Sequence, residues 1–189
     1  PVPLSAHPTV IVFALIFIAL NLRPALSSLA PVLPEVMQTT GISAATASLL
    51  TMAPVLCLGL FGFITPRLAS RFGSARTLIG ALLLLSTGIG LRGISAFPSL
   101  LTGTLMGGAG IGIAGVLLPG LVKRDFPQQA TLMTGVYTMA LCAGAATAAA
   151  LTVPLARWLD GWPPALAFWA LPALAAALFW LPQARRQFH

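Results

Sequence analysis

Six long apolar runs constrain this chain more than any other feature of its sequence. They cover approximately Thr9–Leu33, Ala44–Thr65, Ala75–Leu91, Pro98–Leu121, Thr131–Ala156 and Pro164–Leu181. Each is close to the roughly 20 residues that an α-helix needs to cross a bilayer. Only 7% of the residues are charged, whereas a soluble domain carries about 25%. The chain is therefore predicted to be an all-α membrane protein with six transmembrane helices.

Turn-forming residues separate the runs. Gly41 and Ser43 divide the first from the second, and Gly73 with Ser74 reads as a helix stop followed by an N-cap. Later boundaries fall at Phe97-Pro98, Phe126-Pro127 and Asp160-Gly161. We expect one domain over residues 1–189.

The basic residues predict how the chain is oriented. Arg92 and Arg157 fall in loops on one side, and the opposite side holds Arg67, Arg71, Arg76, Lys123, Arg124, Arg185 and Arg186. Cytoplasmic loops of membrane proteins are rich in Lys and Arg. Both termini are thus expected in the cytoplasm, in a bacterial-type inner (plasma) membrane. The charges are single residues or pairs between apolar runs, which does not favour a nucleic-acid partner. Trp158 and Trp162 are expected at the outer membrane interface and Trp180 near the inner one.

The sequence repeats itself weakly at a common offset of about 87 to 90 residues. Thr51-Met52-Ala53 recurs as Thr138-Met139-Ala140, and the Pro66–Gly73 spacing recurs as Pro154–Gly161. Because three helices are an odd number, a second copy of such a unit inserts upside down relative to the first. We therefore expect two inverted three-helix repeats, over approximately 8–95 and 96–185, as in many secondary transporters.

One cation interrupts the first apolar run, in the stretch Asn21-Leu22-Arg23-Pro24. An arginine at membrane depth costs about 2.5–3.5 kcal/mol, so it usually faces a polar cavity or a partner. Pro24 removes a backbone donor and is expected to kink the helix beside it. We interpret Arg23 as the anion-facing group of a transporter. The alternative is a structural arginine that pairs with carbonyls or with an acid of a neighbouring helix.

Three other side chains are candidate solute contacts. Ser27 lies one turn from Arg23 on the same face, and Tyr137 is either a contact or a packing residue. Asn21 points to a different face, from which it could instead tether a neighbouring helix. The fourth run is expected opposite Arg23, and it has glycines four residues apart, at Gly103 and Gly107 and at Gly108 and Gly112. This spacing lets helices pack closely. It would also leave space beside the charge.

Acids are scarce, and Glu35, Asp125 and Asp160 all fall at or beyond the ends of the runs. If transport is driven by protons, the coupling group is either Glu35 or a residue outside this chain. Otherwise Glu35 is solvated or pairs with Arg92. No paired carboxylates, metal-ligand spacing, Gly-x-Ser-x-Gly motif or phosphate loop occurs. We therefore expect neither an enzyme nor a cofactor.

Several stretches together resemble the cyanate and 2-nitroimidazole transporter branch of the major facilitator superfamily. They are Asn21–Ala25 followed by Pro31–Glu35, Gly115–Pro127, and Leu151–Ala156. Residues Leu68–Arg76 resemble the superfamily's Leu-Ala-Asp-Arg-x-Gly-Arg-Arg loop, with Ser70 in place of the usual Asp.

The resemblance implies a transporter of two six-helix halves that works by alternating access, of which this chain covers the first. Its cytoplasmic loop residues would take part in the conformational change or anchor helix ends, namely Arg71, Gly73, Arg76, Lys123, Arg124 and Asp125. The expected partners are the lipid bilayer, a small solute, and a second six-helix half or a second copy.

The expected function is secondary active or facilitative transport of a small anionic or polar organic solute. Two alternatives remain open. One is efflux of uncharged hydrophobic drugs, in which Arg23 is structural. The other is a membrane scaffold that transports nothing.

Overall fold

A computed structural model describes residues 8–186, which form nine α-helices and one 3-10 turn. The helices are α1 (Pro8–Leu22), α2 (Pro24–Ser27), α3 (Leu29–Thr40), α4 (Ala44–Phe72), α5 (Ser74–Leu91), α6 (Phe97–Asp125), α7 (Ala130–Trp158), α8 (Trp162–Phe168) and α9 (Ala170–Arg186). The 3-10 turn, η1, spans Pro127–Gln129.

These elements join into six segments long and apolar enough to cross a membrane, by length and composition, within the described part of the chain. The first combines α1, α2 and α3, the fifth η1 and α7, and the sixth α8 and α9. The six predicted spans and the all-helical class are thereby confirmed, although most of the helices run several residues beyond the predicted limits.

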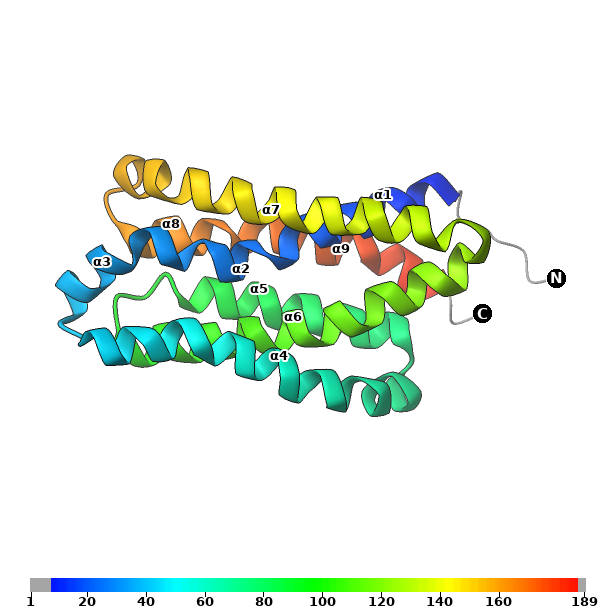
Figure 1. Cartoon of the computed structure of the whole chain (residues 1–189), viewed down its shortest axis with the longest axis horizontal. Coiled ribbons are helices and arrows are strands. Elements are labelled where there is room, and N and C mark those ends of the chain that lie inside the picture. The colour runs from blue at the N-terminus through cyan, green and yellow to red at the C-terminus, as the bar shows by residue number, and fades with distance from the viewer. Residues whose placement is uncertain (1–7, 187–189) are drawn as a thin grey trace.

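The helices lie side by side along the long axis of the molecule (Figure 1). α6 packs against both α4 and α5, α5 also contacts α9, and α1 packs against α7 and α9. In Figure 1, α4, α6, α2 and α7 lie on the near face and α9 lies behind them. α1 begins and α9 ends at the same end of the bundle.

The caps between the spans agree largely with the expected breaks. Gly41 closes α3 with a positive φ of 71°, and the Ser43 hydroxyl accepts the Thr46 N–H at 3.2 Å to begin α4. The predicted N-cap at Ser74 is wrong by one residue. Gly73, at φ 85°, stands at the boundary of α4 and α5, and Ser74 is already helical.

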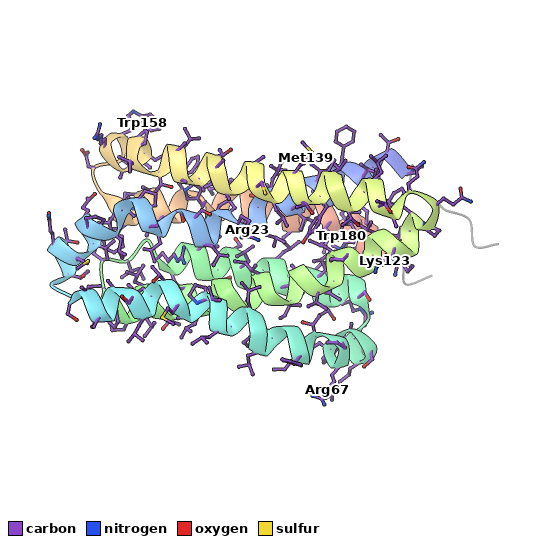
Figure 2. All side chains as sticks on the ribbon, in the orientation of Figure 1. Arg23, Arg67, Lys123, Met139, Trp158 and Trp180 are labelled. Atoms are coloured by element: carbon purple, nitrogen blue, oxygen red, sulfur yellow. The ribbon has the colours of Figure 1, made fainter. Side chains whose placement is uncertain are left out.

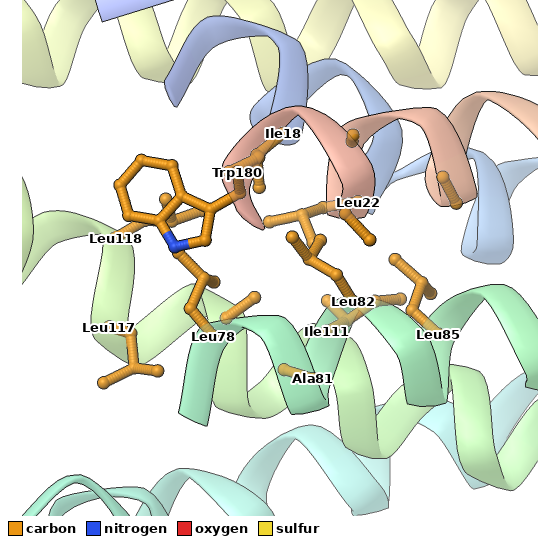
Figure 3. Packing of buried hydrophobic residues seen from close by; sticks show 14 of the residues in the cluster. Ile18, Leu22, Leu78, Ala81, Leu82, Leu85, Ile111, Leu117, Leu118 and Trp180 are labelled. Carbon is orange, nitrogen blue, oxygen red and sulfur yellow. The ribbon is translucent and has the colours of Figure 1, made fainter. Parts of the chain in front are cut away.

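The larger hydrophobic core lies among α1, α5, α6 and α9 (Figure 3). Trp180 of α9 is 1% exposed and packs there with Ile18, Leu22, Leu78 and Leu118. Trp162 is 2% exposed, and its indole N–H donates to the Thr39 hydroxyl at 2.8 Å. Trp162 and Trp180 therefore face the interior of the bundle, whereas Trp158 is 79% exposed at the end of α7. Their positions at the membrane interfaces stay predictions.

The glycines of α6 let two neighbouring backbones approach on different sides. A Cβ on Gly108 would lie 2.6 Å from Cα of Pro54 in α4, and one on Gly110 would lie 2.7 Å from the Ala81 carbonyl in α5. Toward the first span, a Cβ on Gly107 would make only an ordinary contact with Ala25, at 3.8 Å. The glycines of α6 therefore allow close helix packing, which is one of their two predicted roles. The helices that pack closely against them are α4 and α5.

Candidate solute-binding site

The first span is interrupted where the sequence predicts it. α1 ends at Leu22, α2 begins at Pro24, and Arg23 lies between them with near-helical backbone angles. Proline has no N–H to donate to the carbonyl four residues earlier, so Pro24 leaves the Leu20 carbonyl without its helical partner. That carbonyl lies against Gly144 of α7, where a Cβ would collide with the Leu20 backbone. The break is thus also a place where α7 approaches the first span closely.

The Arg23 side chain is exposed, and it makes no hydrogen bond or ion pair with any described residue. Figure 2 places it near the middle of the bundle's length, between the layer of α1 and α7 and the layer of α5 and α6. Within residues 8–186, the structure therefore does not contain the alternative in which Arg23 pairs with carbonyls or with an acid.

Two of the other predicted contacts lie near Arg23, and one faces away. The Ser27 N–H donates to the Arg23 carbonyl at 3.0 Å, so Ser27 lies one turn on and is half-buried. The charge of Arg23 acts on the Tyr137 hydroxyl, although Tyr137 is partly packed against the core. Asn21 is 4% exposed, and its side-chain amide donates to the Phe17 carbonyl of its own helix at 2.7 Å. It therefore belongs to the core rather than to the surface around Arg23.

Glu35 lies at the far end of the first span, away from Arg23. It lines an open hollow of about 540 Å³ between α3 and the end of α7, together with Arg157 and Asp160. The predicted pairing of Glu35 with Arg92 is wrong, because the Arg92 guanidinium is 1% exposed and bonded to other groups.

Arg92 lies between α5 and α6, as the charge pattern predicts, but it is the C-cap of α5 and its side chain is buried. Its Nη1 donates to the Ala25 carbonyl at 2.6 Å and its Nε to the Thr104 hydroxyl at 3.2 Å. The only hint in the sequence was that Arg92 follows the shortest apolar run directly, with no acid beside it.

The predicted loop residues lie around the α4–α5 boundary and at the end of α6. Figure 2 places Arg67 and Lys123 toward the end of the bundle where α1 begins and α9 ends. Arg71 lies over the Phe72 ring, 5.4 Å from its centroid. Arg124 pairs with Asp125 at 2.7 Å, and Lys123 and Arg76 are exposed. Within residues 8–186, no group of three His, Cys, Asp or Glu residues could hold a metal ion.

An ionisable residue inside a membrane span usually marks a functional site, and Arg23 is such a residue in the first of the six spans. The model of the Major Facilitator Superfamily matches residues 9–188, and the chain belongs to this superfamily.

Curated relatives agree with that assignment. The chain is 38% identical to the 2-nitroimidazole transporter of Escherichia coli (strain K12), over 95% of this chain and 46% of that protein. It is 36% identical to the cyanate transport protein CynX of the same organism, over 92% of this chain and 45% of that protein. An uncharacterized transporter of Bacillus subtilis (strain 168), YycB, is 36% identical over 94% of this chain and 44% of its own length. The chain thus spans less than half the length of these relatives.

Among solved structures, the crystal structure of a peptide transporter, in complex with sulfate, has the same fold. The TM-score is 0.81 at 17% identity, over 95% of this chain and 38% of that one. The chain is accordingly a multi-pass membrane protein with the helical fold of its superfamily.

Proposed function

We propose that this chain forms half of the solute pathway of a transporter for a small anionic or polar organic compound. Arg23 attracts and orients the solute, and Ser27 and Tyr137 are its second contacts. The observation that carries the proposal is the free, exposed guanidinium of Arg23 in the interior of a membrane-spanning segment.

Electrostatics favours a solute with negative charge or strong acceptors. An arginine at membrane depth requires a partner or water, and Arg23 finds no acid among the described residues. Arginine presents a planar fork of donors that suits small planar oxyanions and similar groups. The cyanate and 2-nitroimidazole transported by two relatives are small polar compounds of this kind, and we propose the same class for this chain.

A second six-helix half, either the rest of a longer chain or another copy, would complete the pathway. Large apolar side chains on α4 and α7 support this, since they are exposed in the single half, among them Leu56, Phe63 and Met139. The concentration of basic residues at the end where α1 begins supports placing both termini in the cytoplasm. The division into two inverted three-helix repeats, over 8–95 and 96–185, remains part of this proposal.

Transport would follow from a shift between inward- and outward-open states that solute binding biases. The loop residues Arg71, Gly73 and Arg76 would act in that change, and the Lys123–Asp125 segment would anchor the end of α6. Glu35, in the hollow with Arg157 and Asp160, is the proposed coupling group at the opposite end.

The test is uptake or efflux of labelled cyanate and 2-nitroimidazole by the complete transporter and by Arg23→Ala. We expect Arg23→Ala to abolish transport while membrane expression stays normal. Arg67→Ala is the control, because Arg67 is an exposed arginine at the end of α4. Transport by Arg23→Ala at the wild-type rate would refute the assignment. Competition by small anions that weakens with salt would separate an anion pathway from efflux of uncharged drugs.

A further inference from the structure

We propose that Arg92 is a positioning residue for the solute-binding surface around Arg23. Its guanidinium replaces a backbone hydrogen bond that the first span lacks, and so fixes the short helix that follows Arg23. The inference rests on the proposed function of Arg23.

The missing bond lies between α2 and α3. In a continuous α-helix the Leu29 N–H would donate to the Ala25 carbonyl, but α2 ends at Ser27 and α3 begins at Leu29. No backbone bond between these two groups occurs in the structure. A buried carbonyl without a donor is costly, and Arg92 Nη1 supplies one at 2.6 Å.

Arg92 is itself held firmly in place. Its Nε donates to the Thr104 hydroxyl, and that hydroxyl donates to the Leu100 carbonyl at 2.7 Å. Gly103 makes room for the arrangement, since a Cβ there would lie 3.2 Å from Cγ of Arg92. A continuous set of buried hydrogen bonds therefore runs from α6 through the end of α5 to α2.

Two of the three proposed solute contacts belong to this turn, because Arg23 is the N-cap of α2 and Ser27 is its last residue. The Arg23 carbonyl accepts the N–H groups of Leu26 and Ser27, at 2.9 and 3.0 Å. Ala25 lies inside this turn, so a bond that fixes its carbonyl also limits the movement of Arg23 and Ser27. Arg92 has no carboxylate partner among the described residues, so its charge also makes the surroundings of Arg23 more favourable to an anion.

The experiment compares three variants of the complete transporter. Arg92→Gln removes the charge and shortens the reach, Arg92→Lys keeps the charge with a single donor group, and Arg67→Gln is the matched control. We expect Arg92→Gln to raise the KM for cyanate by about tenfold. Arg92→Lys should fall between it and the wild type, and Arg67→Gln should leave the KM unchanged.

A second measurement does not depend on any solute. Hydrogen exchange of a peptide covering residues 21–30 should be faster in Arg92→Gln than in the wild type, with α4 peptides unchanged. A purely structural role would lower the amount of active protein, and hence Vmax, without moving the KM. If Arg92→Gln does not fold, Thr104→Val and Arg92→Lys are judged by the same two measurements.

Wild-type KM or wild-type exchange at 21–30 in a folded variant overturns the positioning role while leaving the proposed function intact. Wild-type transport by Arg23→Ala would instead defeat the proposed function, and the exchange measurement would still decide whether Arg92 holds the segment.

Discussion

Two arginines lie at or bond to the break in the first span, and they differ in exposure and in hydrogen-bond partners. Arg23 belongs to the span itself, yet its side chain is exposed and free of described partners. Arg92 follows the end of α5, yet it is 1% exposed and donates to two acceptors on different helices.

The difference lies in the acceptors that each guanidinium can reach. Burial of a charge is tolerable only where acceptors are already held in place. The interrupted helix offers Arg92 the Ala25 carbonyl, and α6 offers it the Thr104 hydroxyl. Arg23 bonds to neither, so its hydrogen-bonding capacity stays available to a ligand. The two arginines at this break are therefore told apart by their acceptors, because Arg92 is bonded to two of them and Arg23 to none among the described residues.

The largest expected effect on stability separates the two residues directly. Arg92→Ala should lower the free energy of unfolding by about 3 kcal/mol or more, because it opens a cavity and leaves the Ala25 carbonyl unpaired. Arg23→Ala should change it by about 0.5 kcal/mol at most, as at other exposed positions. Thermal or denaturant unfolding in detergent measures both. Equal losses would mean that Arg23 is as structural as Arg92.

A smaller loss of stability is expected from a substitution at the point where α7 approaches the break. Gly144→Ala should destabilise by about 1–3 kcal/mol, since its Cβ would meet the Leu20 backbone and not a movable side chain. Gly135→Ala is the control on the same helix, because nothing lies within 4 Å of a Cβ there. The control should be neutral or slightly stabilising. If both variants unfold alike, the contact on the Arg23 side of the break is loose.

The Arg92 side of the break can be weakened by removing one hydroxyl. Thr104→Val should destabilise by about 1–2 kcal/mol, because it leaves Arg92 Nε without its acceptor. Thr102→Val, two residues earlier on the exposed side of the same helix, removes only a bond to its own helix at the Pro98 carbonyl. The difference between the two losses in the free energy of unfolding reports how much the position of Arg92 depends on α6. No difference between them would contradict the anchoring role of Thr104.

The smallest effect is expected at Tyr137. Tyr137→Phe removes the hydroxyl on which the Arg23 charge acts while keeping the ring that packs against the core. The KM for cyanate should rise about threefold or less, as for the loss of one weak hydrogen bond. Stability should stay unchanged. A KM rise as large as that of Arg92→Gln would make Tyr137 a principal contact.

The sequence predicts the fold well, because apolar length and turn residues determine spans directly. The break at Pro24 and the caps at Gly41 and Ser43 follow from backbone chemistry that depends on single residues. Arg92 and Trp162 could not be placed in the same way. Their burial depends on the Ala25 carbonyl and the Thr39 hydroxyl, which come from distant parts of the chain, and hydropathy carries no information about such pairs.

The glycines of α6 also have a consequence for biogenesis. Two-thirds of the most apolar window of this segment is buried within the bundle, and its neighbours α4 and α5 approach it backbone to backbone. Glycine adds little to the partition of a helix into lipid. We therefore expect α6 to reach its final position only with α4 and α5 beside it, so that these three helices assemble as one unit.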